Sequence, residues 1–142
     1  LFSELISFHE LWEARKLIEP TICGMAAERV NEVQLKNLEQ ILKDTEKTFF
    51  QDGDFPYLAA IFHREIAQIA GNRVLVFLVD CLLTIRKMSR HKVMLEKGYQ
   101  ESALHSHQVI LEAIKLRDKE KAQLLMAEHL ERVQKYYDTC CL

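Results

Sequence analysis

Proline and glycine are scarce in this sequence: the 142 residues include two Pro and four Gly. So few turn-forming residues argue against a chain rich in β-hairpins, and an apolar fraction of 49% argues against disorder. Basic residues are not in excess either, because 19 Lys and Arg face 21 Asp and Glu. Nucleic-acid binding by this segment is therefore not indicated, since neutralising phosphates takes clustered Lys and Arg. The totals are typical of one compact, mostly helical domain.

The sequence also lacks a long apolar run and a paired cysteine motif. No stretch reaches about 18 consecutive apolar residues, the length that spans a bilayer, and no charged-then-apolar leader is present. Cys23, Cys81, Cys140 and Cys141 have no metal-ligand spacing, and the last two are neighbours that rarely bridge each other. We therefore expect free thiols in a reducing compartment, and a soluble, cytoplasmic protein that does not bind membranes.

Six helices are predicted from the three- and four-residue spacing of apolar side chains. Pro20 falls inside the first and is expected to bend it or to remove a hydrogen bond. Residues 97–100 are weakly patterned, so the fifth helix is expected to begin after them. Asn or Asp stands where four helices begin and can cap them: Asn31, Asp54, Asn72 and Asp118. The expected helices cover about 7–29, a segment from 32, 54–71, 72–85, a segment around 107, and 118–137.

The predicted helices form a single domain. No internal repeat, Ser/Gly linker or low-complexity stretch divides residues 1–142. The fourth helix carries the densest apolar run, residues 74–79, which continues past Asp80 to Ile85. A helix that is apolar nearly all round is covered on both sides. We therefore expect this helix to face the core on one side and a second subunit on the other, which predicts a homodimer.

Three histidines lie on the apolar stripes of three different predicted helices. His63, His107 and His129 each have apolar neighbours at helical spacing, so all three rings are expected in one interior. A buried imidazole needs a hydrogen-bond partner or a metal, because an unpaired one costs about 1–3 kcal/mol. Neutral imidazole is a preferred ligand of zinc, nickel, copper and iron. Three such residues predict a site, whereas His9, His91 and His105 are expected at the surface or in loops.

Two arginines are candidates for binding an acidic ligand. Arg15 lies on the apolar stripe of the first helix, where it either pairs with Glu19 or directs its planar guanidinium at a bound carboxylate. Arg86 follows Asn72 by fourteen residues, four helical turns, and so lies on about the same face. Arg15, Asn72 and Arg86 are therefore the predicted effector-binding residues.

Three segments in this order resemble one bacterial family. They are Glu13-Ala-Arg15-Lys-Leu-Ile-Glu19-Pro, Phe62-His63-Arg-Glu-Ile-Ala, and His107-Gln-Val-Ile-Leu-Glu-Ala-Ile114. Together they resemble the C-terminal effector-binding and dimerisation domain of FadR-type regulators in the GntR superfamily. The resemblance covers nearly the whole chain, so residues 1–142 are expected to be that domain. The winged-helix DNA-binding domain that would precede it is absent from this chain.

The resemblance implies an antiparallel all-α bundle of about six helices with a central ligand or metal pocket. Such domains dimerise, bind a small metabolite, and relay its presence to the DNA-binding domain. Many members hold a divalent metal with one aspartate and three histidines, and the histidine positions correspond to His63, His107 and His129. The aspartate position, four residues before the first histidine, is Ala59. A methyl group cannot bind a metal, so water or the effector would complete the coordination.

Three functions are compatible with these residues. The first is a sensor in which zinc or nickel on the three histidines binds a small carboxylate, with DNA contacted only through the missing domain. The second is a metal-free sensor whose histidines contact the ligand directly, which Ala59 favours. The third is a hydrolase whose histidine-bound metal activates water. No acidic residue shares a stripe with the histidines as a general base, and Glu65 lies on the wrong side of its helix.

Overall fold

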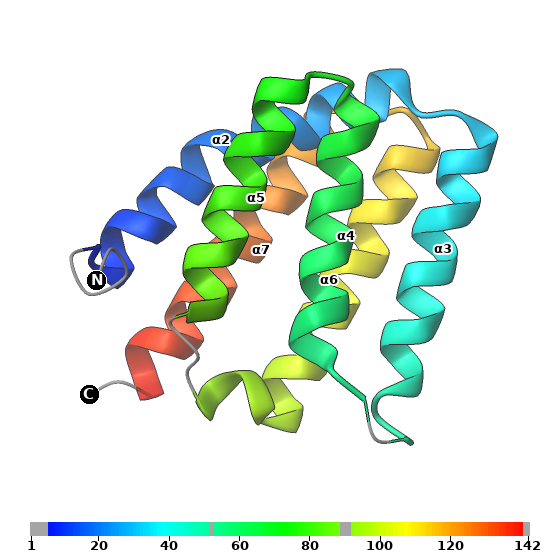
Figure 1. Ribbon diagram of the computed structural model, residues 1–142. Coiled ribbons are helices and arrows are strands. Elements are labelled where there is room, and N and C mark those ends of the chain that lie inside the picture. The colour runs from blue at the N-terminus through cyan, green and yellow to red at the C-terminus, as the bar shows by residue number, and fades with distance from the viewer. Residues whose placement is uncertain (1–5, 52, 89–91, 141–142) are drawn as a thin grey trace.

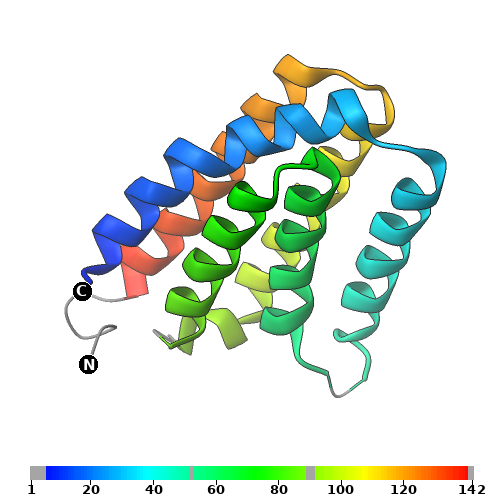
Figure 2. The same ribbon diagram turned by 45° about the horizontal axis from the view of Figure 1, so that its top comes forward.

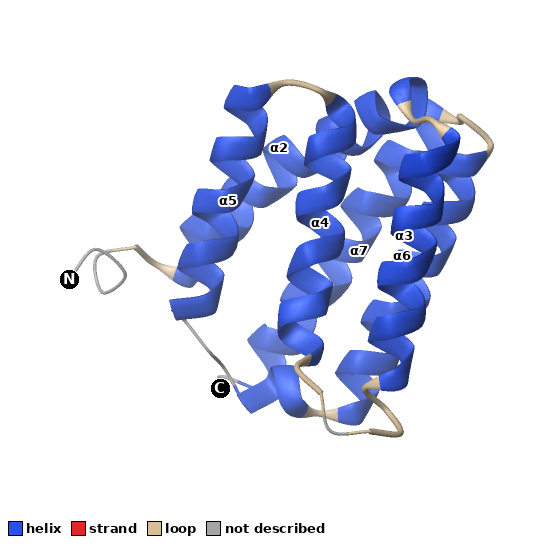
Figure 3. Cartoon of the chain, turned by 45° about the vertical axis from the view of Figure 1, so that its right-hand side comes forward, coloured by secondary structure: helices blue, strands red, loops and turns tan. Residues whose placement is uncertain are grey.

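The computed structural model describes residues 6–51, 53–88 and 92–140. These residues form six α-helices and one 3₁₀ helix and contain no strand (Figure 3). In chain order the elements are α2 (Phe8–Arg29), α3 (Glu32–Lys47), α4 (Phe55–Ala70), α5 (Arg73–Met88), η1 (Lys92–Leu95), α6 (Lys97–Lys115) and α7 (Lys119–Cys140). The expected all-α architecture of about six helices is confirmed.

Short connections make consecutive helices antiparallel. The chain reverses between α4 and α5 at Gly71, which adopts the left-handed conformation with φ of 75° that glycine tolerates best. It reverses again over residues 116–118 between α6 and α7 (Figure 1). As a result α2, the first described helix, lies alongside α7, the last (Figure 2). The bundle therefore brings together segments from the two halves of the chain.

Side-chain caps fix where most helices begin, as the sequence predicts. Asn31 caps α3 by accepting a hydrogen bond from the backbone N–H of Gln34, whose side chain bonds back to Asn31. Asp54 accepts from Tyr57, and Asp118 accepts from Lys121. Each of these bonds satisfies a backbone donor that the first helical turn leaves free.

Two predicted helix boundaries are wrong. Helix α6 begins at Lys97 instead of after residue 100, and α7 continues through Cys140 instead of ending near residue 137. The first turn of α6 contains one core residue, Tyr99, so it has no apolar repeat from which it could be predicted. The 3₁₀ helix η1 before it was not predicted either. Pro20 lies inside α2, as expected, and α2 continues past it.

The core is formed by the apolar stripes of all the helices. It includes fully buried Trp12, Phe62 and Ile110, and the three candidate histidines lie among these residues. Helix α5 has two different faces: Val79 and Leu83 are buried, whereas Val74 and Phe77 are each 66% exposed. The apolar face predicted to meet a second subunit is thus uncovered in one copy. Within the described ranges, no helix is long and apolar enough to cross a membrane.

Candidate metal and effector site

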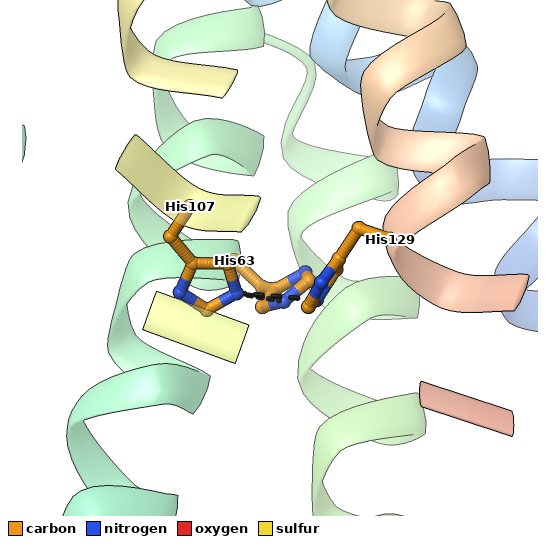
Figure 4. Close-up of side chains that lie close together, drawn as sticks. All are labelled: His63, His107 and His129. Carbon is orange, nitrogen blue, oxygen red and sulfur yellow. Dashed lines mark hydrogen bonds between the residues drawn. The ribbon is translucent and has the colours of Figure 1, made fainter. Parts of the chain in front are cut away.

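The three candidate histidines meet at one point inside the bundle. His63 comes from α4, His107 from α6 and His129 from α7, and each is at most 3% exposed. Nε2 of His107 lies 3.2 Å from Nε2 of His63 and 3.2 Å from Nε2 of His129 (Figure 4). One ligand nitrogen from each ring lies within 4.8 Å of the other two. The predicted convergence of the histidines is therefore present.

Helix α2 supplies a carboxylate behind the first of these rings. Nδ1–H of His63 donates a hydrogen bond to Oε2 of Glu19. The other oxygen of Glu19 accepts from Nε of Arg15 at 2.6 Å, and all three side chains are buried. The guanidinium of Arg15 also lies 4.6 Å from the ring centre of Trp12, a cation–π contact. Of the two alternatives for Arg15, pairing with Glu19 is the one observed.

The hydrogen bond to Glu19 fixes the proton of His63. Since a neutral imidazole has one N–H and His63 uses it at Nδ1, its Nε2 presents a lone pair to the centre of the cluster. Tautomers are assigned from such partners, and here the partner is a carboxylate. The carboxylate of Glu19 therefore prepares His63 to accept a proton or to bind a metal at Nε2.

The other two histidines each have a ring nitrogen without a hydrogen-bond partner in the described part of the chain. Nδ1 of His107 and Nδ1 of His129 are buried and have no hydrogen-bond partner there. Nε2 of His107 has a ring nitrogen on either side but carries at most one proton. Unpaired buried nitrogens cost stability, so this cluster is unfavourable in a protein that only folds. A cation at the shared point would use all three lone pairs at once.

Burial keeps these groups in the form that binds metals. Burial lowers the pKa of His107 and of His129 well below the ordinary range, and the charges of neighbouring groups lower each further. Burial also lowers the pKa of His63, and Glu19 opposes that change. For Glu19 itself, burial raises the pKa, but Arg15 and His63 more than offset it and hold the carboxyl ionised. The cluster is thus three neutral imidazoles beside one internal ion pair.

Two of the three nitrogen separations match a divalent metal site. Nitrogens at about 2.0–2.1 Å from a tetrahedral ion stand about 3.3 Å apart, close to the two separations of 3.2 Å, and the three ligand nitrogens all lie within 4.8 Å of one another. Ala59, four residues before His63 on α4, is 4% exposed and offers no donor atom. The residues present could therefore hold a metal through three imidazoles and leave at least one coordination position for an exogenous ligand.

The other predicted effector-binding residues lie in different surroundings. Arg86 is 6% exposed and donates a hydrogen bond to the carbonyl oxygen of Pro56 at 2.9 Å. Its positive charge contributes to the lowered pKa of His63 and His107, so it lies near the cluster. Asn72 is exposed, and its side-chain oxygen accepts from two backbone N–H groups at the start of α5. Asn72 acts as a helix cap there and is not part of the buried cluster.

The spacing of Arg15 and Glu19 predicts their pairing, but it does not predict the contact of Glu19 with His63. The place of Glu19 behind His63 depends on how α2 packs against α4, which a stripe on one helix does not specify. Of the histidines expected at the surface, His9 and His105 are exposed and His91 lies outside the described residues. Cys23 is buried and Cys81 exposed, both as free thiols, and burial together with Glu19 raises the pKa of Cys23 to about 12.

The described residues form an all-helical bundle with three histidines meeting in its interior. Comparison with known proteins gives the class: residues 10–132 match the model of the FCD domain family, so the chain belongs to that family. The resemblance to the ligand-sensing domain of GntR-family regulators is thereby confirmed. This class of domain is regulatory, so the hydrolase alternative is not supported.

Named relatives are regulators of transcription. The chain is 33% identical over 130 residues to the Uxu operon regulator of Haemophilus influenzae, covering 88% of this chain and 49% of that protein. It is 31% identical to the HTH-type transcriptional regulator YcbG of Bacillus subtilis, covering 86% of this chain and 51% of that protein. It is 26% identical to the HTH-type transcriptional repressor NanR of Cronobacter sakazakii, covering 85% of this chain and 47% of that protein. The chain thus spans about half the length of these relatives.

Solved structures show the same fold. GntR of Streptococcus agalactiae superposes with a TM-score of 0.81 at 25% identity, covering 93% of this chain and 62% of that one. McbR/YncC of E. coli superposes with a TM-score of 0.79 at 17% identity, covering 94% of this chain and 67% of that one. The arrangement of helices around the histidine cluster is therefore one that regulators of this family adopt.

The depressed pKa values of the histidines predict that the metal-free protein loses stability in mild acid. The folded state keeps His107 and His129 neutral, whereas the unfolded chain binds protons on both below about pH 6.5. Their contribution is complete above that pH and is lost as the pH falls towards the folded-state pKa values. Each ring adds up to about 1.4 kcal/mol per pH unit to the slope. Urea unfolding with chelator between pH 7.5 and 5 measures this slope.

A histidine variant and an exposed control separate this effect from general acid sensitivity. His129→Gln is expected to reduce the slope, because one of the depressed groups is gone. His105→Gln, at an exposed position two residues from His107, is expected to leave the slope unchanged. Equal slopes in the wild type and in His129→Gln would show that the buried ring does not control the acid response.

Proposed function

We propose that this domain senses a small organic acid at a divalent metal, zinc or nickel, held by His63, His107 and His129. The convergence of three neutral Nε2 atoms on one buried point supports this proposal most directly. Burying such groups is difficult to explain by folding alone.

The ligand set favours zinc or nickel with an open position. Imidazole suits both metals, and a site with three protein ligands leaves room for water or a bound acid. Ala59 removes the carboxylate that many members of this family use, so the effector's own carboxylate would occupy the open position. Three neutral imidazoles leave the charge of the ion uncompensated, which strengthens the attraction for an anion.

Glu19 and Arg15 support the site from behind in this proposal. Histidines that bind a metal commonly donate their second N–H to a carboxylate, which fixes the ring and raises its basicity. Among the three rings, His63 has such a partner in Glu19, and Arg15 keeps that carboxylate ionised. Arg15 thus acts through Glu19, since its Nε and Nη2 atoms are already directed at the carboxylate.

The functional output would be a change in how two copies are arranged. The exposed apolar face of α5, with Val74 and Phe77, is suited to a homodimer contact. An acid that binds one arrangement of the helices better than another shifts the population towards it. In a regulator, that shift would alter the spacing of two N-terminal DNA-binding domains in the cytoplasm. The relatives named as an operon regulator and a repressor support this role.

A metal-free sensor is the second candidate, and Ala59 is the observation that favours it. In that case ring N–H groups of the histidines would donate hydrogen bonds directly to the carboxylate of the acid. The presence of bound metal distinguishes the two, because acid binding by itself is expected for both.

Replacing the histidines one at a time tests the metal site. His63→Ala, His107→Ala and His129→Ala each remove one of three ligands, so each is expected to reduce bound zinc or nickel from one per chain to well below that. Elemental analysis after dialysis against the metal measures it. His105→Ala, on the exposed side of α6, is the matched control and is expected to keep full occupancy. Unchanged stoichiometry in all three variants would exclude the proposed site.

Glu19→Gln tests the support behind His63. Loss of the carboxylate is expected to weaken zinc binding by about 10–100-fold, the usual effect of removing an outer partner of a ligating histidine. Competition with a chromophoric chelator measures the affinity. Glu13→Gln, an exposed position on the same helix, is the control and is expected to bind like the wild type.

Because Glu19→Gln leaves Arg15 buried without its partner, the variant can lose stability as well. The double variant Arg15→Gln/Glu19→Gln removes both charges and is expected to regain stability while still binding zinc weakly. Wild-type affinity in the folded double variant would show that the carboxylate does not support the site.

A further inference from the structure

A cavity lies between α4 and α5, and none of the three histidines lines it. The cavity has a volume of about 400 Å³ and extends to Met94 of η1. Its charged lining consists of Asp54, Arg64, Asp80, Arg86 and Lys87. The cavity is large enough for a small metabolite.

Most of the charged side chains that line this cavity already have a partner or are exposed to water. Arg64 donates to Asp80 at 2.8 Å, and both side chains are partly exposed. Asp54 accepts the backbone N–H of Tyr57 as the cap of α4. Lys87 is exposed to water. None of these groups requires a ligand.

Arg86 is the exception. It is 6% exposed, its one hydrogen bond among the described residues goes to the carbonyl oxygen of Pro56, and no carboxylate there forms an ion pair with it. Burial lowers the pKa of Arg86, which reflects how unfavourable this charge is where it lies. A buried charge without a counter-ion destabilises the folded state, so retaining one at a cavity wall points to an anion that binds there.

The hydrogen bond to Pro56 places the Arg86 guanidinium against the helix that carries His63. Pro56 and His63 are seven residues apart on one face of α4, about 10 Å along the helix axis. With a divalent ion at the cluster and the Arg15–Glu19 pair neutral overall, three positive charges would be uncompensated.

We propose that the effector is a dicarboxylic acid that binds one carboxylate at the histidine cluster and the other at Arg86. The inference rests on the proposed function and specifies the ligand class of the same site. A planar guanidinium matches a carboxylate in two parallel hydrogen bonds. The second carboxylate of the acid would supply the counter-ion that Arg86 lacks, with the connecting carbon chain running along α4 between Pro56 and His63. The span along α4 fits an acid of four to six carbons.

Isothermal titration of the zinc-loaded protein with matched acids tests this proposal. Adipate and hexanoate have the same six carbons and differ in one carboxylate, and succinate and butyrate form the shorter pair. A diacid is expected to bind at least tenfold more tightly than its matched monoacid. Arg86→Gln is expected to abolish that difference by weakening the diacid, with the monoacid changed by less than about twofold.

Arg64→Gln is the matched control, because it removes a cation from the same cavity that is already paired with Asp80. It is expected to keep the preference for the diacid. Arg86→Met adds a readout that does not depend on any ligand: thermal unfolding without acid is expected at or above the wild-type midpoint, because an unpaired buried charge is removed. It also provides a folded test protein should Arg86→Gln be unstable.

The possible failures are distinguishable. Equal affinity of diacid and monoacid in the wild type, or a preference that persists in the folded Arg86 variants, would overturn the dicarboxylate assignment and leave the metal site intact. Absence of zinc binding would refute the proposed metal instead. The same titrations on metal-free protein would then test Arg86, with diacid preference supporting its role and no preference overturning it.

Discussion

The arrangement of protons on three buried imidazoles is the constraint on which the rest of this structure depends. Nitrogens from His63, His107 and His129 meet at one point, and too few N–H groups are available there to pair them all. The hydrogen bond to Glu19 keeps the proton of His63 on Nδ1, so Nε2 of His63 brings no proton to the centre. The cluster is therefore rich in lone pairs and poor in hydrogen-bond donors, which is the condition that a metal ion relieves.

The helical bundle makes this arrangement possible by joining distant parts of the chain. The cluster uses α4, α6 and α7, while α2 contributes Glu19 and Arg15 behind it. Because α2 packs against both α7 and α4, a shift of α2 would move the carboxylate relative to His63. The structure therefore links the protonation and position of one metal-ligand candidate to helix packing. A sensing domain needs such a link if binding at its centre is to change its surface.

Much of the fold and the central residues could be predicted from the sequence. Asn31 and Asp54 mark helix starts through local chemistry, and the stripes around His63, His107 and His129 place those rings inside. The start of α6 could not be predicted, because Tyr99 is the one core residue in its first turn. Contacts between helices are also absent from a periodic pattern, which is why the place of Glu19 behind His63 was missed. Asn72 caps α5, as its position before that helix predicts, and it lies at the surface and not in the buried cluster.

Ala59 gives this member of the family a distinct electrostatic character. With no carboxylate at that position, the charge of a bound ion and that of buried Arg86 have no protein counter-ion beyond the one already used by Arg15. Charge balance would then have to come from the ligand. In the proposed metal site, Ala59 would both remove a protein ligand of the ion and make the site more selective for acids.

X-ray absorption spectroscopy at the zinc edge of the zinc-loaded protein tests the central claim most directly. The account predicts three imidazole ligands and oxygen in the remaining coordination positions, with no sulfur. A spectrum with fewer than three imidazoles, or with a sulfur ligand, would contradict it.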